Sequence, residues 1–556
     1  MRTQPLSAPL VFDGHSTPVK SALFIVICAA WILTGLVGHD PWKSDEALTF
    51  GVVYQMLRSG DWLIPAIVDQ PHTEYPPLYY WVSASLAWLF SPVLALHDGA
   101  RLASGLFMLI TVVYARKIAA RLYDERAGRI AVLLLLGCLG LFLRGHEMNP
   151  ELAGLAGMCM ALYGLACVRS EPGRGGRYLG IGSAVIGLSI GIVPACFPLV
   201  IACAVLLALG ELGQRTNLRG LVVASAILIA GICTFPLLLW ASGQDLGTWA
   251  PALSGLPLAA GRRGTDITYF VSVLPWFAMP ALPFALWLWW QERRRVRERF
   301  EIAMPLVAFV VLLVLLSLMR KGNDAVALVL LVPLSLAAAA TPDRLPPGIA
   351  RFMDWFGLVF FGLGIVAAWL YWIAAVTGIP PGAARAVARQ VPGFSFSVSW
   401  TALFVAATLT ALWAYAVVRA HRNNRRAIVN WTAGITLLWV LPNVLALAAF
   451  DHGRSYRGVT QALLERLPPE RDCIYGVDLG DAQRALLHYF GSLRFAKVDG
   501  GRGCQALLTQ GTRERIPETP PGWELTAEFS RPGDAVERLR LYLPVRSAEP
   551  GLEKSR

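Results

Sequence analysis

The residues with the clearest chemical potential are two adjacent acids, Asp45 and Glu46, in a polar stretch that follows the first strongly apolar run of the chain. A carboxylate held beside a substrate can orient an attacking group or remove its proton. Clustered acids also suit a divalent cation, although no motif of the sequence requires one. A carboxylate at a membrane surface is more often a solvated residue that caps a helix. The pair therefore indicates a site only if other polar residues lie close to it.

Other polar segments would lie close to the pair if they are on the same side of a membrane. The turn 144–151 holds acids, an amide and a histidine, and the segments 242–267 and 319–324 each contain two adjacent cations. Basic side chains bind phosphate, and carboxylates beside them can act on a reacting centre. The candidate catalytic residues are Asp45, Glu46 and Glu151, and the candidate substrate-binding residues are His146, Asn149, Arg262, Arg263, Arg320 and Lys321.

Several of these residues also fit purely structural roles. Glu151 follows Pro150 in the first turn of a predicted helix, where an acid favours the positive end of the helix dipole. A single histidine such as His146 is more often a hydrogen-bonded interfacial side chain than a metal ligand. Arg320 and Lys321 can simply end a helix, although two cations on the outer side depart from the usual charge distribution. The residues alone leave both interpretations open.

Composition indicates that the framework is a polytopic membrane protein. The 556 residues are 55% hydrophobic and 15% charged, with a mean hydropathy of +0.52, whereas soluble proteins contain roughly 25% charged residues. The net charge of +12 comes from short Lys and Arg clusters between apolar runs. That distribution is typical of cytoplasmic loops and not of a nucleic-acid-binding surface. The first run, 21–37, has no cleavage pattern after it and is expected to remain as a span.

About thirteen apolar runs have the length of a membrane span. They are 21–37, 99–119, 128–145, 150–168, 178–194, 196–210, 218–241, 268–290, 301–318, 324–340, 352–377, 399–419 and 427–450. The basic connections share one side only if the aromatic-rich segment 77–97 lies in the interface and does not cross. This topology places the N-terminus in the cytoplasm, and it places the polar segments above and everything after 451 on the outer side.

The region after residue 451 is predicted to form a small domain. Apolar alternation predicts strands at 473–477, 506–508 and 539–545, and helical patterning covers 456–467 and 481–489. The predicted fold class is therefore an α-helical polytopic membrane protein with about thirteen transmembrane helices and a small C-terminal α/β soluble domain. The expected divisions are a membrane domain 1–450 with an outer loop 38–98, a periplasmic domain 451–546 and a disordered tail 547–556.

Cys473 and Cys504 are the only two cysteines in this C-terminal region. On an oxidising side of the membrane they are candidates for a disulfide. Each would serve equally well as a buried core thiol, so the pairing stays open at this point.

The stretch SDEALTFGVVYQMLRSGDWLIP, followed by HTEYPPLYYW, resembles the first outer loop of the GT-C membrane glycosyltransferases, which use polyprenyl-phosphate sugars as donors. It is most similar to the lipid A aminoarabinose transferases and their protein O-mannosyltransferase-like relatives. In this resemblance Asp45 and Glu46 match an acidic pair, and the block from Ser59 to Trp62 matches an SGDW element. ARLASG, MNPELAG and LPWFAMPAL match weaker elements further along the chain.

The chain departs from the family pattern at cations. The family arginine after the acidic pair falls at Leu48, the lysine of an EKP element falls at Tyr75, and the lysine of a TKG element falls at Ile190. The second family acid aligns with Asn149, which leaves Glu151 as a substitute two residues on. The resemblance also adds Glu74 and Tyr75 to the substrate-binding candidates. Either the other outer cations replace the missing ones, or the donor differs, or activity has been lost.

The resemblance implies an inverting glycosyltransferase of the bacterial inner membrane. Its partners would be a polyprenyl-phosphate sugar donor, a lipid A, glycan or protein acceptor on the periplasmic face, and membrane lipids, with no nucleic acid. The missing cations keep open a non-catalytic relative that only binds polyprenyl lipids. A lipid flippase or transporter is less favoured, because the ionisable residues gather at the outer boundary and not within the spans.

Overall fold

The computed structural model describes residues 18–42, 45–256, 267–319, 324–342, 345–419, 425–469, 473–496, 504–515 and 521–545. Four predicted substrate-binding residues, Arg262, Arg263, Arg320 and Lys321, lie outside these ranges. The predicted disordered tail 547–556 also lies outside them.

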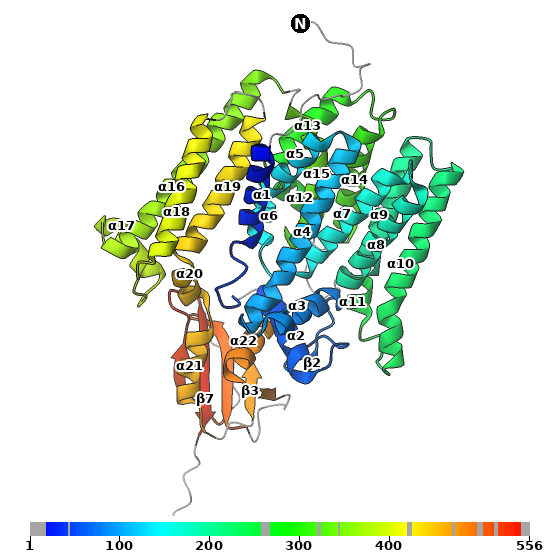
Figure 1. The fold of residues 1–556 in the computed structure, drawn as a ribbon. Coiled ribbons are helices and arrows are strands. Elements are labelled where there is room, and N and C mark those ends of the chain that lie inside the picture. The colour runs from blue at the N-terminus through cyan, green and yellow to red at the C-terminus, as the bar shows by residue number, and fades with distance from the viewer. Residues whose placement is uncertain are drawn as a thin grey trace, which may run out of the picture.

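Long helices form a bundle, and a sheet lies at one end of it (Figure 1). The bundle contains α1 (Pro18–Leu33), α4 (Leu96–Leu122), α5 (Glu125–Leu136), α6 (Leu139–Arg144), α7 (Pro150–Val168), α8 (Pro172–Ile190), α9 (Ile192–Ala208), α10 (Arg215–Ala241), α12 (Ile267–Phe277), α13 (Ala281–Glu292), α14 (Phe300–Leu318), α15 (Asp324–Ala339), α16 (Pro347–Thr377), α18 (Trp400–Arg419) and α19 (Arg426–Leu445). Within the described ranges, seven helices are long and apolar enough to cross a membrane, or eight if one bent pair counts as a span.

Four predicted spans differ from the helices observed. The run 128–145 forms two helices, because α5 ends at Leu136 and α6 begins at Leu139. The run 178–194 crosses the boundary between α8 and α9 at Gly191. The run 268–290 forms α12 and α13, which meet at 106°. The run 427–450 ends its long helix at Leu445. Hydropathy alone did not reveal these breaks, since glycine and proline interrupt a helix without lowering its apolar character.

Short elements connect the long helices, and α2, α3 and α20 lie between the bundle and the sheet (Figure 1). The helix α3 has 13 residues, a length of about 20 Å, which is short of the roughly 30 Å apolar core of a bilayer. This helix spans Leu78–Phe90. The other short elements are α2 (Asp45–Ser59), β1 (Ala66–Ile67), β2 (Gln70–Pro71), α11 (Ala250–Ser254), α17 (Pro381–Gln390) and α20 (Leu447–Arg454).

The C-terminal sheet has the strand order β4-β3-β5-β7-β6. Its central strand β5 pairs in parallel with β3 and antiparallel with β7, where Leu508 lies opposite Leu541 in the buried centre. The three predicted strands and two predicted helices are all present, and β4 and β6 were not predicted. The elements are β3 (Ile474–Val477), β4 (Phe495–Ala496), β5 (Ala506–Thr512), β6 (Trp523–Phe529), β7 (Glu537–Pro544), α21 (Arg457–Arg466) and α22 (Asp481–Gly491).

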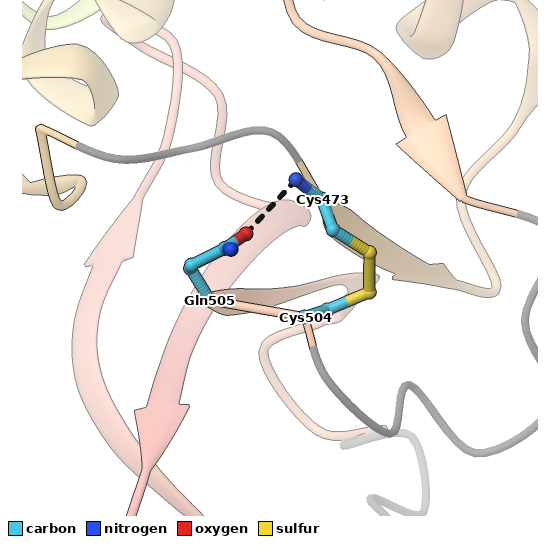
Figure 2. The surroundings of a disulfide bond; sticks show 3 residues. All are labelled: Cys473, Cys504 and Gln505. Atoms are coloured by element: carbon cyan, nitrogen blue, oxygen red, sulfur yellow. Dashed lines mark hydrogen bonds between the residues drawn. A yellow bond between two sulfur atoms is a disulfide. The ribbon is translucent and has the colours of Figure 1, made fainter.

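A disulfide joins Cys473 and Cys504, so the structure adopts the first of the two alternatives left open by the sequence (Figure 2). The backbone N–H of Cys473 also donates to the side-chain oxygen of Gln505 at 2.9 Å. These two contacts connect the residues that immediately precede β3 and β5.

The helix α22 packs directly on α2 and thereby fixes the sheet against the loop that carries the acidic pair. Gly51 faces Ala485 so closely that any side chain at position 51 would collide with it. The rings of Phe50 and Tyr489 meet edge to face with centroids 4.8 Å apart. The position of α2 is therefore set from both sides, by the bundle and by the sheet.

Candidate active site between the bundle and the sheet

A cavity of about 780 Å³ opens where the bundle meets the C-terminal sheet, and we call it the junction cavity. Its walls come from the segment between α1 and α2, the start of α2, the end of α6 with the turn after it, the helices α16, α19 and α20, the end of α17, and the loop before β7. The polar and charged side chains of its lining include Trp42, Glu46, His146, Glu147, Arg454 and Arg531. Segments from both ends of the chain thus share one cavity.

The two adjacent acids enter different networks. Glu46 is buried and binds Arg101, with 2.7 Å between Oε1 and Nε. Arg101 is fully buried, and its Nη1 also donates to Asp98 and to the carbonyl of Leu36, both at 3.0 Å. Burial alone would raise the pKa of Glu46, but the charge and hydrogen bond of Arg101 outweigh it and lower that pKa below its ordinary value. Glu46 is therefore an ionised anchor whose main contact lies away from solvent.

Asp45 instead reaches Arg144, with 3.4 Å between Oδ2 and Nη1, and half of its side chain is exposed. Arg144 also binds Glu147 at 2.9 Å and Asp324 at 3.3 Å. Three carboxylates thus surround one cation. Burial raises the pKa of Glu147 to about 7, although the charge of Arg144 opposes that rise. In this network Asp45 is the carboxylate with the greatest access to a ligand.

Glu151 faces away from the junction cavity. Its carboxylate accepts a 2.6 Å hydrogen bond from the hydroxyl of Tyr75 and borders a separate apolar pocket beside Ile190. Asn149 begins the same helix as its N-cap, accepting the backbone N–H of Glu151 at 2.9 Å. Burial, reinforced by the charge of Glu151, raises the pKa of Tyr75 well above its ordinary value, so its hydroxyl stays a donor. Glu74 is exposed and lies 3.8 Å from His72.

His146 lines the junction cavity with its ring held in place. The ring packs against Trp31 and Trp439, with centroids 4.3 and 4.2 Å away. Its Nε2 donates to the carbonyl of Trp31 at 2.6 Å. Among the residues that the structure describes, no group of three His, Cys, Asp or Glu side chains is arranged to hold a metal ion.

A further ion network, which the sequence did not predict, connects the segment between α1 and α2 with the C-terminal region. Asp40 binds the hydroxyl of Ser455 at 2.7 Å and the guanidinium of Arg457 at 2.9 Å. Asp451 accepts the indole N–H of Trp42 at 3.1 Å. Because these partners are separated by more than 400 residues, no local sequence pattern indicates that they pair. Arg101 could have been predicted to form a buried ion pair, because a cation within a spanning run needs a buried partner.

Comparison with known proteins shows which class of protein this chain resembles. Residues 74–240 match the family model for dolichyl-phosphate-mannose-protein mannosyltransferase. The chain is 24% identical over 432 residues to an undecaprenyl phosphate-alpha-4-amino-4-deoxy-L-arabinose arabinosyl transferase of Pectobacterium carotovorum, covering 72% of this chain and 73% of that protein. It is 25% identical over 464 residues to the transferase of the same name from Pseudomonas aeruginosa, covering 78% and 76%.

A solved structure shows the same fold. The crystal structure of ArnT from Cupriavidus metallidurans bound to undecaprenyl phosphate superposes with a TM-score of 0.68 at 17% identity, covering 95% of this chain and 98% of that one. The helical bundle with a C-terminal sheet is therefore common to both proteins. The resemblance predicted from the first outer loop is confirmed.

Proposed function

We propose that this chain, which has the fold of a membrane glycosyltransferase, moves a sugar from a polyprenyl-phosphate donor to a lipid A-type or other acceptor at the periplasmic face. The observation that carries the proposal is similarity over 72% and 78% of the chain to transferases named for an undecaprenyl phosphate sugar. The junction cavity adds a place for the reaction, because Glu46, Glu147, Arg454 and Arg531 line it. Asp45 lies outside this lining and is connected to it through Arg144, which binds both Asp45 and Glu147.

The proposed topology has about thirteen crossings in a bacterial inner membrane, with a cytoplasmic N-terminus. Helices α1, α8, α9 and α15 would cross although they fall short of the length or apolarity of the other spans. The pairs α5 with α6 and α12 with α13 would each form one broken span. The sheet would then be a periplasmic domain within 451–546, where the disulfide between Cys473 and Cys504 suits an oxidising compartment.

The reaction we propose is a displacement at the anomeric carbon. An acceptor oxygen forms the new bond from the face opposite the phosphate, the bond to the phosphate oxygen breaks, and the phosphate leaves with the electron pair. Asp45 would orient the acceptor and take its proton where that acceptor is a hydroxyl. Where the acceptor is already an anionic phosphate, Asp45 would only position it. Glu46 would act by holding α2 in place through Arg101.

Charge on the departing phosphate is the larger electrostatic task. The proposed ligands of that phosphate remain Arg262, Arg263, Arg320 and Lys321. The first two belong to the segment between α11 and α12, and the last two belong to the segment between α14 and α15. Glu151 and Tyr75 would line the route of the lipid chain, because they meet beside an apolar pocket.

The test is sugar transfer in inner-membrane vesicles supplied with a panel of polyprenyl-phosphate sugars, followed by mass spectrometry of the lipid and protein fractions. The wild type is compared with Asp45→Asn and with Glu465→Gln, an exposed acid on α21 that serves as the matched control. We expect a sugar adduct with the wild type and with Glu465→Gln, and its loss with Asp45→Asn. Absence of any adduct, together with retained binding of the lipid carrier, would favour the non-catalytic polyprenyl-lipid-binding relative.

A further inference from the structure

Arg454 differs from the other described arginines of this region in its partners. It is the last residue of α20 and lines the junction cavity. Its guanidinium carbon lies 4.6 Å from the centre of the Trp42 ring and 5.7 Å from that of Phe450. Within the described part of the chain, no carboxylate lies within ion-pair distance of it. Aromatic faces thus hold the cation, and its N–H donors remain available.

The neighbouring cations are already neutralised. Arg101 and Arg144 each bind two or more carboxylates, Arg457 binds Asp40, and Arg531 binds Asp534 and Glu537. Each of these arginines would have to give up an existing ion pair before binding an external anion. Arg454 would give up none, so its binding energy is fully available to a ligand.

The surroundings of Arg454 favour an anion. Arg531 donates to the backbone carbonyl of Arg454 at 3.2 Å, which fixes the end of α20. Partial desolvation and the nearby charge of Arg531 lower the pKa of Arg454 from its ordinary value, although its side chain keeps access to solvent. An anion bound to Arg454 would oppose both effects, because negative charge stabilises the cation.

We propose that Arg454 binds the phosphate of a lipid substrate in the junction cavity, with Trp42 as the platform that holds its guanidinium. The proposal rests on the proposed function, and it names the residue that recognises the charged end of a lipid in the same cavity. The planar fork of an arginine pairs with two phosphate oxygens at once. The position at the bundle end suits a lipid whose apolar chain stays among the helices. That phosphate belongs either to the polyprenyl donor or to the acceptor lipid.

Lipid binding by the purified full-length protein tests this without any transfer reaction. Native mass spectrometry would measure affinities for undecaprenyl phosphate and for undecaprenol, which lacks the phosphate. A second pair of ligands would be a lipid A phosphate and its dephosphorylated form. The variants are Arg454→Gln, Arg454→Lys and, as matched control, Arg466→Gln, which removes an exposed arginine from the neighbouring helix α21.

We expect the preference for the phosphate form of one lipid pair to fall by ~10-fold or more in Arg454→Gln, which corresponds to one lost charge-assisted hydrogen bond. Arg454→Lys should restore part of the preference, and Arg466→Gln should leave it unchanged. The pair that responds identifies the donor or the acceptor. A merely structural role would weaken phosphate and alcohol forms equally, so it would leave the ratio unchanged.

The proposal is overturned if the ratio is the same in Arg454→Gln and wild type for both lipid pairs. It is also overturned if the wild type shows no phosphate preference at all. Failure of the proposed function is a separate result. Phosphate-dependent binding through Arg454 without any sugar transfer would remove the transferase and keep this inference, whereas transfer with unchanged binding in Arg454→Gln would do the reverse.

Discussion

Two arginines at the same end of the bundle organise carboxylates in opposite ways. Arg101 has no exposed surface, and its partners Glu46 and Asp98 are 5% and 12% exposed. Arg144 is 19% exposed, and its partners Asp45, Glu147 and Asp324 are 52%, 32% and 39% exposed. Each network has more carboxylates than arginines. The first is closed to solvent, whereas the second, with three carboxylates around one cation, opens to it.

The difference shows why adjacent acids need not share a role. Asp45 and Glu46 begin the same helix, but successive helical positions point about 100° apart. Glu46 therefore turns inward to Arg101, while Asp45 turns outward to Arg144. A structural role for the closed network and a chemical role for the open one predict separable effects of mutation.

The largest expected effect is on the closed network. Arg101→Gln would leave the buried carboxylates of Glu46 and Asp98 without their cation. Losing one member of a buried ion pair costs roughly 3 to 5 kcal/mol. We therefore expect a large drop in the midpoint temperature of unfolding in detergent and a low yield of folded protein.

The matched control for that prediction is Arg116→Gln. Arg116 forms an exposed ion pair with Glu125, and such pairs contribute about 1 kcal/mol or less. Equal destabilisation by the two substitutions would contradict the division into closed and open networks.

The next effect is on the open network. Arg144→Gln would release Asp45 from the cation that restrains it, at little cost in stability because the pairs are partly solvated. Misplacing a reacting group by about 1 Å lowers rates by roughly 10²-fold. We expect transfer in vesicles to fall by that order while the unfolding midpoint stays close to the wild type. A variant that loses stability and keeps its rate would show that Arg144 belongs with Arg101.

Local patterns in the sequence were sufficient for most helices, the central strands and the polar turn at 144–151, but not for the breaks between α5 and α6 or between α12 and α13. They were also sufficient to single out Asp45 and Glu46, because polar residues are rare in an apolar chain. They could not separate the two acids, since the choice of partner depends on which helix lies on each side. Asp40 with Arg457 shows the same limit, because ion pairs across the whole chain depend on tertiary packing.

A smaller effect is expected at the pair formed by Tyr75 and Glu151. Tyr75→Phe removes a 2.6 Å hydrogen bond to a buried carboxylate and keeps the ring. Such a bond contributes about 1 to 3 kcal/mol. We expect a modest fall in the unfolding midpoint together with weaker binding of the lipid chain. The matched control is Tyr54→Phe, whose hydroxyl accepts a hydrogen bond from the exposed Arg58. Comparable falls in the unfolding midpoint of both variants would mean that the buried hydrogen bond to Glu151 contributes no more to stability than the exposed one.

The smallest expected effect concerns pH and tests the charge excess of the open network. The pKa of Glu147 is raised by burial to about 7, above its ordinary value. The native state therefore binds more protons than the unfolded state between these two values. The free energy of unfolding must then fall as the pH rises through that window, from roughly pH 5 to pH 7.

Glu147→Gln removes the titrating group and keeps its shape. We expect the free energy of unfolding of the variant, relative to that of the wild type, to rise by less than ~1 kcal/mol between roughly pH 5 and pH 7, because solvent screens a side chain that is a third exposed. Unfolding midpoints of both proteins at each pH measure this difference. Groups common to both proteins cancel in this difference, so it isolates Glu147. If instead the free energy of unfolding of the wild type rises relative to that of the variant as the pH rises, the charge of Arg144 has fully offset the effect of burial on the pKa of Glu147. The open network would then carry no retained proton, and its excess negative charge would have to be balanced by a cation from another segment or from the substrate.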